Sequence, residues 1–263
     1  MIEDVAIRLG EAWAVCALVQ AVLWLVAQRT KNAGIVDVGW ALSFSAVVLV
    51  FALQPLAARA SYLPIGLIVV AGSTRRGCYR IQRGAASGPE EGRYAELRRR
   101  WALHASRRFF VFFQAQALLV AVLATAFVVP FVIAPWDDGP LRAAGATIAA
   151  IGVVGEALAD LQLARWKRDP QHKGKVCDVG LWGYSRHPNY FFEWLVWIGY
   201  AVYGLAYWPW GAIAFGGQAI ILGSIFGVTG IPPTENQALR SKGDAYRQYQ
   251  ARVSRFVPMP PKQ

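Results

Sequence analysis

Charged residues are scarce in this sequence, and acidic residues are scarcer than basic ones. Only 16% of its 263 residues are Asp, Glu, Lys or Arg, whereas 56% are hydrophobic. A typical soluble domain has about 25% charged residues, so this composition excludes an ordinary soluble protein and indicates a polytopic membrane protein. The net charge of +11 does not indicate a nucleic-acid partner, because the Lys and Arg residues fall between hydrophobic segments and not along one amphipathic stripe.

The motifs of soluble nucleotide-dependent and metal-dependent enzymes are also absent. The three cysteines and three histidines form no CxxC pair and have no spacing typical of a metal site, so we expect free thiols and no metal ion. The sequence has no GxGxxG after a strand pattern, no Walker loop, no GxSxG and no HExxH. A Rossmann domain is therefore excluded, and any nucleotide must bind directly to helices and cytoplasmic loops.

Long hydrophobic segments are what the sequence has in abundance. A bilayer core needs about 20 apolar residues per helix. Of the 27 Lys and Arg residues, 24 fall in four segments that alternate with the proposed outer loops, as expected for cytoplasmic segments. We predict an all-α polytopic membrane protein, one domain over residues 1–263, with the N-terminus outside and the C-terminus cytoplasmic. The seven predicted transmembrane helices cover residues 8–28, 35–53, 60–81, 109–134, 141–164, 189–207 and 209–231.

The segment from Gly180 to Trp197, GLWGYSRHPNYFFEWLVW, is the strongest candidate for a functional site. Pro188 suits the first turn of a helix, which then places Asn189 and Glu193 on one face. A carboxylate inside an apolar span is costly unless it has a partner, so Glu193 is a functional candidate. In the structural alternative, Asn189 and Glu193 only cap the N–H groups of the helix.

Three other carboxylates inside predicted spans are also candidates. Asp37 begins the second span, where it could act in chemistry or could cap the helix. Glu156 and Asp160 lie one turn apart near the end of the fifth span, where the helix dipole disfavours negative charge, so they need cationic or hydroxyl partners. Cations follow at once in ARWKRDPQHKGK and could clamp phosphates, although a solvated cytoplasmic loop would have the same composition. Likewise, basic residues 98–100 could form a membrane-surface helix.

Two stretches resemble a known family. LWGYSRHPNYFFEWLVWIGYAVY and the tail TGIPPTENQAL, YRQYQ and FVP are similar to the steroid 5-alpha-reductase family of membrane reductases, in particular its bacterial, DUF1295-like branch. They are more distantly similar to isoprenylcysteine carboxyl methyltransferases and sterol C14 reductases. The resemblance implies an enzyme of the bacterial inner membrane that reduces the activated C=C of a 3-oxo-Δ4 steroid or similar lipid enone, with NADPH as cofactor and membrane lipids around it.

The resemblance also implies site residues. The cytoplasmic loops 82–108 and 165–188 and the tail 232–263 would form the cofactor side. Glu235 stands where the family has a histidine, which changes the charge of that contact. The implied cofactor-binding residues are Arg93, Tyr94, Asp160, Lys167, Arg168, Lys175, Tyr184, Arg186, His187, Asn189, Glu193 and Glu235.

At the reducing end, the family uses a carboxylate on the second span and a tyrosine on the third. Asp37 fits the first role, and Tyr79 is the available tyrosine, although it stands nearer the cytoplasm than its family counterpart. Hydride addition to an enone develops negative charge on oxygen, which a protonated carboxyl or phenol in a dry pocket stabilises. Asp37 and Tyr79 are therefore the expected catalytic residues.

Two other functions remain open from the sequence. The first is an S-adenosylmethionine-dependent methyltransferase of the isoprenylcysteine methyltransferase type. The methyl donor has no phosphate, so five nearby cations suit NADPH better. The second is a non-catalytic lipid-binding or scaffold protein, which would not need carboxylates in three separate spans.

Overall fold

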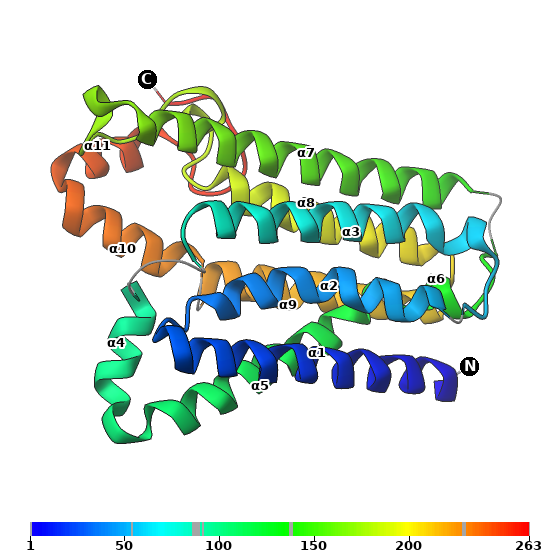
Figure 1. Ribbon diagram of the computed structural model, residues 1–263. Helices are drawn as coiled ribbons and strands as arrows, with labels where there is room; N and C mark the ends of the chain where they lie inside the picture. Colours follow the sequence, from blue (N-terminus) through cyan, green and yellow to red (C-terminus); the bar gives the residue numbers. More distant parts are fainter. Residues whose placement is uncertain are drawn as a thin grey trace. The chain divides into compact units, whose positions relative to one another are not determined.

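A computed structural model describes residues 2–53, 55–85, 90, 92–136, 139–227 and 230–262 (Figure 1). Within these ranges there is no strand, and the predicted all-α class is confirmed. Parts of the predicted loop 82–108, namely residues 86–89 and 91, lie outside the described residues. The α-helices are α1 (Ile2–Thr30), α2 (Ile35–Leu53), α3 (Arg59–Gln82), α4 (Gly92–Trp101), α5 (Ala105–Ala124), α6 (Val129–Val132), α7 (Pro140–Arg168), α8 (Pro188–Leu205), α9 (Ala214–Gly227), α10 (Ile231–Lys242) and α11 (Asp244–Arg252). Short 3-10 helices are η1 (Ala102–His104), η2 (Pro170–His172), η3 (Gly180–Gly183) and η4 (Trp210–Ile213).

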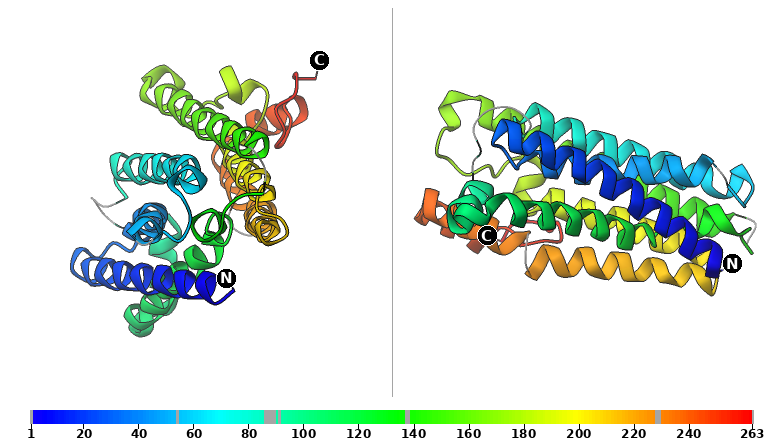
Figure 2. Two further views of the ribbon diagram at one scale, coloured as in Figure 1. Left: turned by 90° about the vertical axis from the view of Figure 1, so that its right-hand side faces the viewer. Right: turned by 60° about the horizontal axis from the view of Figure 1, so that its bottom comes forward.

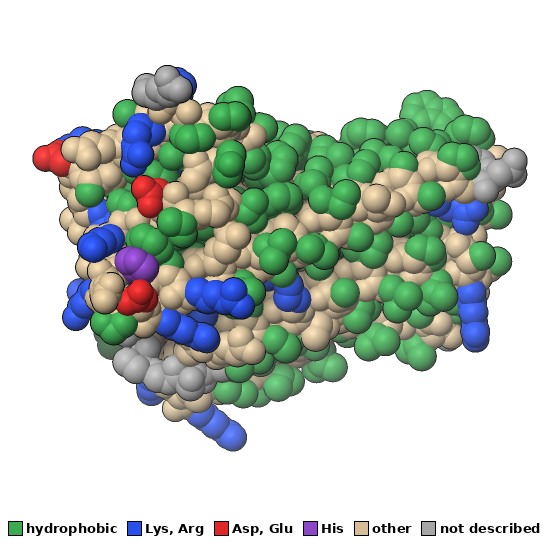
Figure 3. All heavy atoms as spheres, turned by 90° about the horizontal axis from the view of Figure 1, so that it is seen from above, with side chains coloured by type: hydrophobic (Ala, Val, Ile, Leu, Met, Phe, Trp, Pro, Cys, Tyr) green, Lys and Arg blue, Asp and Glu red, His purple; other side chains and the backbone are tan. Residues whose placement is uncertain are grey.

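The helices are those of an integral membrane protein. Five helical stretches of the described chain are long and apolar enough to cross a membrane: Ile2–Thr30, Ile35–Leu53, Gly92–Ala124, Pro140–Arg168 and Trp210–Lys242. In the last stretch the apolar part is α9, and the polar helix α10 follows it. In Figure 3, hydrophobic side chains cover the flanks of the visible helices, whereas Lys and Arg gather at helix ends.

The predicted third and sixth spans correspond to α3 and α8, which are not among these five stretches. The second half of α3 contains several arginines, and α8 contains Asn189, Glu193 and several Tyr and Trp residues, which lower its hydropathy. Two boundaries also differ from the prediction. The fourth span ends at Ala124 and is followed by the separate short α6, and the seventh begins with η4. The count of seven spans and the orientation of the termini stay predictions.

The chain forms two compact units: unit 1 contains Met1–Asp138 and Gly204–Ile213, and unit 2 contains Gly139–Tyr203 and Ala214–Gln263. In unit 1, α2 packs against α1, α3 and α5, and α1 also packs against α5, as Figure 2 shows from two further sides. Buried aromatic rings fill this unit; for example, the Tyr62 and Phe131 rings stack with their centroids 4.7 Å apart. The predicted single domain stays a prediction.

In unit 2, glycines bring α7 and α8 into backbone contact. A Cβ atom on Gly145 would lie 2.7 Å from the carbonyl oxygen of Gly199, and one on Gly152 would lie 2.7 Å from the backbone nitrogen of Val196. Small residues permit this close approach of membrane helices. After α9, the chain turns into the polar helices α10 and α11, and a β-bridge joins Ser185, before α8, to Ser254 in the tail. Unit 2 therefore places the loop before α8 against the tail.

Candidate functional site

In unit 1, four polar side chains meet where α2 begins, and we name this group the Asp37 cluster: Asp37, Arg80, Arg93 and Tyr94. The Tyr94 hydroxyl donates to Asp37 Oδ1 at 2.7 Å, and Arg93 Nη2 lies 2.8 Å from the same oxygen. Arg80 Nη1 lies 3.3 Å from Asp37 Oδ2. Both oxygens of Asp37 therefore accept contacts from cations or a phenol, as an ionised carboxylate does.

Packing of α4 explains why Tyr94 reaches Asp37. The Tyr94 side chain is buried in a core cluster that contains Val36, Phe109 and Phe113, and its ring also contacts Phe112 edge to face, with centroids 6.2 Å apart. An aromatic ring buried in this way leaves only its polar end to find a hydrogen-bond partner. The fold thus fixes the phenol and directs its hydroxyl at the start of α2.

A buried carboxylate helps to position this core. Glu90 accepts the backbone N–H of Ala33 at 2.6 Å and is paired with Arg98, whose Nε lies 2.6 Å from Glu90 Oε2. The pair links the chain just before α2 to α4. The Arg98 guanidinium also lies over the Phe109 ring, 4.8 Å from its centroid.

Tyr79, the tyrosine expected from the sequence to donate a proton, is half-buried on α3. The Arg83 guanidinium lies 5.7 Å from the centroid of its ring. It is Arg80, the next residue, that pairs with Asp37. The structure therefore brings Asp37 together with Arg93 and Tyr94, two residues that the resemblance assigned to the cofactor.

In unit 2, a second polar group, the Glu235 cluster, joins the loop before α8 to the tail: Arg186, His187, Glu235, Tyr246 and Gln250. Arg186 Nε donates to Glu235 Oε1 at 2.7 Å, and His187 Nε2 lies 3.3 Å from the same oxygen. Gln250 Nε2 donates to Glu235 Oε2 at 3.2 Å. Arg186 Nη1 also donates to the backbone carbonyls of Gln250 and Val253 at 2.9 and 2.8 Å.

The contacts of Glu235 stabilise its charged form. Burial alone would raise the pKa of this carboxyl, but hydrogen bonds and charge from His187 and Arg186 outweigh burial and lower the pKa of Glu235 to about 2. The pKa of Tyr246 is raised, first by burial and then by the nearby Glu235 charge. Arg186, His187 and Glu235 thus hold the tail against the loop, and their predicted contact with a cofactor stays a prediction.

The loop before α8 is fixed to the C-terminal part of α7. Trp182 Nε1 donates to the carbonyl of Ala159 at 2.9 Å, and the Leu181 N–H donates to Gln162 Oε1 at 2.9 Å. These contacts place the loop beside Asp160, whose side chain is buried, as is that of Glu156 one turn earlier. The end of α7 and the loop before α8 therefore lie side by side within unit 2.

The remaining predicted residues of unit 2 have different exposures. Lys167, Arg168 and Lys175 are exposed at the end of α7 and in the loop after it. Tyr184 is 50% exposed. Asn189 and Glu193 are half-buried, one turn apart on α8.

The chemical types of these side chains match the groups of a dinucleotide phosphate. Exposed cations suit phosphate groups, and carboxylates and an amide suit ribose hydroxyls and a carboxamide. Arg186 fits least, because its Nε and Nη1 atoms already donate inside the Glu235 cluster. Among the residues that the structure describes, no three His, Cys, Asp or Glu side chains gather in a way that could hold a metal ion.

Sequence reasoning missed Arg80 and Gln250, which belong to these clusters, and Glu90, which links the start of α2 to α4. Arg80 lies at the end of the predicted third span and Glu90 in the basic segment after it, where charge is expected for topology alone. Gln250 lies in a polar tail helix and has no signal of its own. No local pattern could have identified them, because the contacts by which they join distant segments span between 15 and 57 residues.

Comparison with known proteins gives one result. A family model described as "Protein of unknown function (DUF1295)" matches residues 23–253. The chain matches no curated protein and no solved structure.

Proposed function

This chain belongs to the DUF1295 family, and on that premise we propose that it is a membrane reductase that uses NADPH to reduce the activated C=C of a 3-oxo-Δ4 steroid or similar lipid enone. The family is associated with steroid 5-alpha-reductase-like proteins. The observation that carries the proposal is the Asp37 cluster, in which a buried tyrosine presents its hydroxyl 2.7 Å from a carboxylate paired with two arginines.

In the proposed reaction, a saturated ketone and NADP⁺ form from enone, NADPH and a proton. When bound, NADPH supplies a hydride to the β-carbon of the enone. The Tyr94 hydroxyl turns from Asp37 to the enone oxygen and stabilises the negative charge that develops there. Asp37 stays paired with Arg80 and Arg93 while the hydroxyl moves, so its charge remains balanced. A proton from water then adds to the α-carbon, and the Tyr94 hydroxyl, which keeps its own proton, returns to Asp37.

Tyr94 takes the hydrogen-bond donor role in this proposal because of the contacts of Asp37. A carboxylate that already lies beside two guanidinium groups is suited to accept a hydrogen bond and so to orient the group that donates it. A phenol beside this carboxylate is suited to donate a hydrogen bond to the substrate. Asp37 is therefore a positioning residue for the Tyr94 hydroxyl. Lys167, Arg168 and Lys175 would bind the phosphates of NADPH, and Asp160, Asn189 and Glu193 its hydroxyl and amide groups.

Binding experiments test the cofactor before any substrate is known. The protein is purified in mild detergent and titrated separately with NADPH and S-adenosylmethionine, because a ligand that binds only the folded state raises the melting temperature. We expect NADPH to raise the melting temperature of the natural protein but not that of Lys167→Ala or Lys175→Ala. Arg247→Ala is the matched control, since Arg247 is exposed and pairs only with its neighbour Asp244 among the contacts described.

Each other outcome has a definite meaning. A rise with S-adenosylmethionine alone would contradict the reductase and favour the methyltransferase. If NADPH raised the melting temperature equally in Lys167→Ala, Lys175→Ala and Arg247→Ala, the cofactor phosphates would bind elsewhere.

A further inference from the structure

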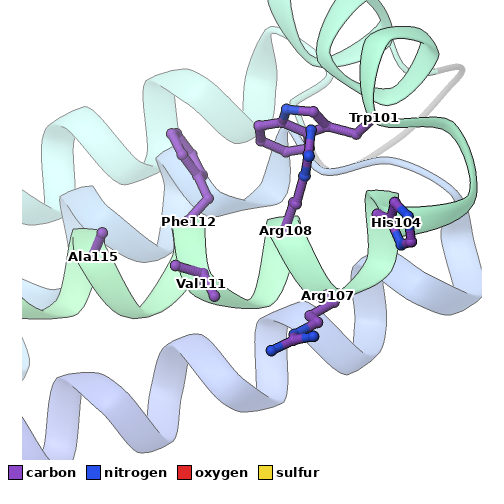
Figure 4. A pocket seen from close by; sticks show the side chains of 7 residues that line it. All are labelled: Trp101, His104, Arg107, Arg108, Val111, Phe112 and Ala115. Atoms are coloured by element: carbon purple, nitrogen blue, oxygen red, sulfur yellow. The ribbon is translucent and has the colours of Figure 1, made fainter.

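A cavity of about 620 Å³ in unit 1 lies outside the Asp37 cluster. Its walls come from α4, η1 and the first three turns of α5 (Figure 4). Arg108 and Phe112 extend toward the Trp101 indole, while Arg107 lies on the other side of α5. The cavity combines two guanidinium groups and the imidazole of His104 with the apolar side chains of Trp101, Val111 and Phe112. Such a lining suits a ligand with an anionic end and an apolar end.

The cations gather at one end of the cavity. Arg107 and Arg108 are exposed in the first turn of α5, and His104 precedes that helix directly. The basic residues Arg98 to Arg100 end α4 nearby in the chain. Basic pockets beside the cytoplasmic ends of membrane helices are typical binding sites of anionic lipid head groups. The charge at this end therefore matches a phosphodiester.

The apolar end continues along α5. Val111, Leu118 and Val122 are 61%, 54% and 42% exposed and, with the exposed Ala115, follow one face of the helix. The opposite face, with Phe109, Phe113 and Ala117, is buried in unit 1. From residue 111 to residue 122 the stripe extends about 16 Å, which is roughly half the thickness of a bilayer core and thus one leaflet. One acyl chain matches this length.

The connection before α5 has the features of a segment that lies at a membrane surface. Leu103, in η1, is 98% exposed, although it is a large apolar residue. The half-buried Trp101 lines the cavity two residues earlier. Apolar and indole side chains placed beside arginines are typical of segments at the boundary between head groups and acyl chains.

From these observations we propose that the cavity binds an anionic phospholipid. Its phosphodiester lies at the end of the cavity that Arg107 and Arg108 line, and one acyl chain lies along Val111, Ala115 and Leu118. The site also adjoins the Asp37 cluster, because the Phe112 ring lines the cavity and contacts the Tyr94 ring. The bound lipid thus supports the side chain that holds Tyr94 in place.

The test uses the full chain in mixed micelles, with phosphatidylglycerol or phosphatidylcholine as the added lipid. Melting temperature and native mass spectrometry report binding. We expect phosphatidylglycerol to raise the melting temperature more than phosphatidylcholine does. In Arg107→Gln/Arg108→Gln, the apparent affinity for phosphatidylglycerol should fall about 30-fold, since each basic residue near a lipid surface contributes about five-fold.

Two control variants distinguish loss of this site from a general loss of positive charge and from misfolding. Arg107→Lys/Arg108→Lys keeps both charges and should keep most of the lipid preference, whereas Arg247→Gln removes a charge elsewhere and should keep all of it. Melting in phosphatidylcholine alone shows whether each variant is folded. Equal effects of both lipids on the natural protein, or an unchanged preference in the Gln variant, would overturn the proposal. The proposal would also be overturned if inorganic phosphate or glycerol phosphate raised the melting temperature as much as phosphatidylglycerol does, since this would indicate a soluble anion as ligand.

Discussion

The hydroxyl of Tyr94 is the single group on which the proposed chemistry depends most. Tyr94→Phe keeps the buried ring but removes the donor, so turnover of an enone substrate should fall about 100-fold, while the NADPH-dependent rise in melting temperature is kept. Steady-state turnover and thermal titration of the same preparation check both expectations.

Tyr79→Phe is the matched comparison, because Tyr79 is the tyrosine that the sequence favoured. Tyr79→Phe should have little effect. If Tyr79→Phe abolished turnover and Tyr94→Phe did not, the donor would be Tyr79. Equal loss of turnover and of NADPH binding in Tyr94→Phe would instead indicate a cofactor contact, as the family resemblance implied.

Glu235 should contribute stability that depends on pH. Its pKa is lowered in the folded protein from the usual 4.5 to about 2, so the folded state favours the charged carboxylate. The contribution is complete above pH 4.5 and is lost as the pH falls toward 2. Glu235→Gln leaves the Arg186 charge unbalanced in a mostly buried site and should cost about 3 kcal/mol at pH 7.

The measurement is the melting temperature of both proteins between pH 7 and pH 2, where we expect the difference between them to shrink below pH 4.5. Asp244→Asn makes the same change of charge in a pair that is 70% and 84% exposed. Surface pairs contribute little, so this control should melt like the natural protein. A difference that stays constant down to pH 2 would contradict the role of the Glu235 charge.

At the scale of elements, the contact of α7 with α8 depends on the absence of side chains. A Cβ atom at position 145 would lie 2.7 Å from the Gly199 carbonyl oxygen, and backbone atoms cannot move aside easily. Gly145→Ala should therefore destabilise the protein by about 2 kcal/mol. The fraction of protein that stays folded and monodisperse after heating in detergent measures this effect.

Gly216→Ala is the matched control for this substitution. Gly216 lies in α9, and no atom lies within 4 Å of the position of its added Cβ. Since alanine favours helix over glycine, Gly216→Ala should be neutral or slightly stabilising. Destabilisation of equal size in both variants would show that general helix effects, and not the close approach, decide the outcome.

At the scale of the whole molecule, the arrangement of Lys and Arg predicts which segments face the cytoplasm. In a background with Cys78→Ser, which removes the exposed thiol, Ala58→Cys should react with a membrane-impermeant maleimide in intact cells. Ser241→Cys should react only after permeabilisation, because it lies on the polar helix α10. Labelling of Ser241→Cys in intact cells would reverse the predicted orientation.

The sequence by itself indicated the helical class, the long apolar helices and the likeness to the DUF1295 family, because each depends on composition or on contiguous patterns. The apolar run that forms α2 was predicted at its exact bounds, and Asp37 was found because a carboxylate in such a run is rare.

Only the tertiary structure decided which polar side chains meet. The partners of Asp37 come from α3 and α4, and those of Glu235 from the loop before α8 and from α11. Such pairings depend on how helices pack and rotate, and this is set by buried rings such as Tyr94 and by close glycines such as Gly145, not by local charge. For this reason the sequence identified the groups that could do chemistry, whereas the structure paired Asp37 with Tyr94.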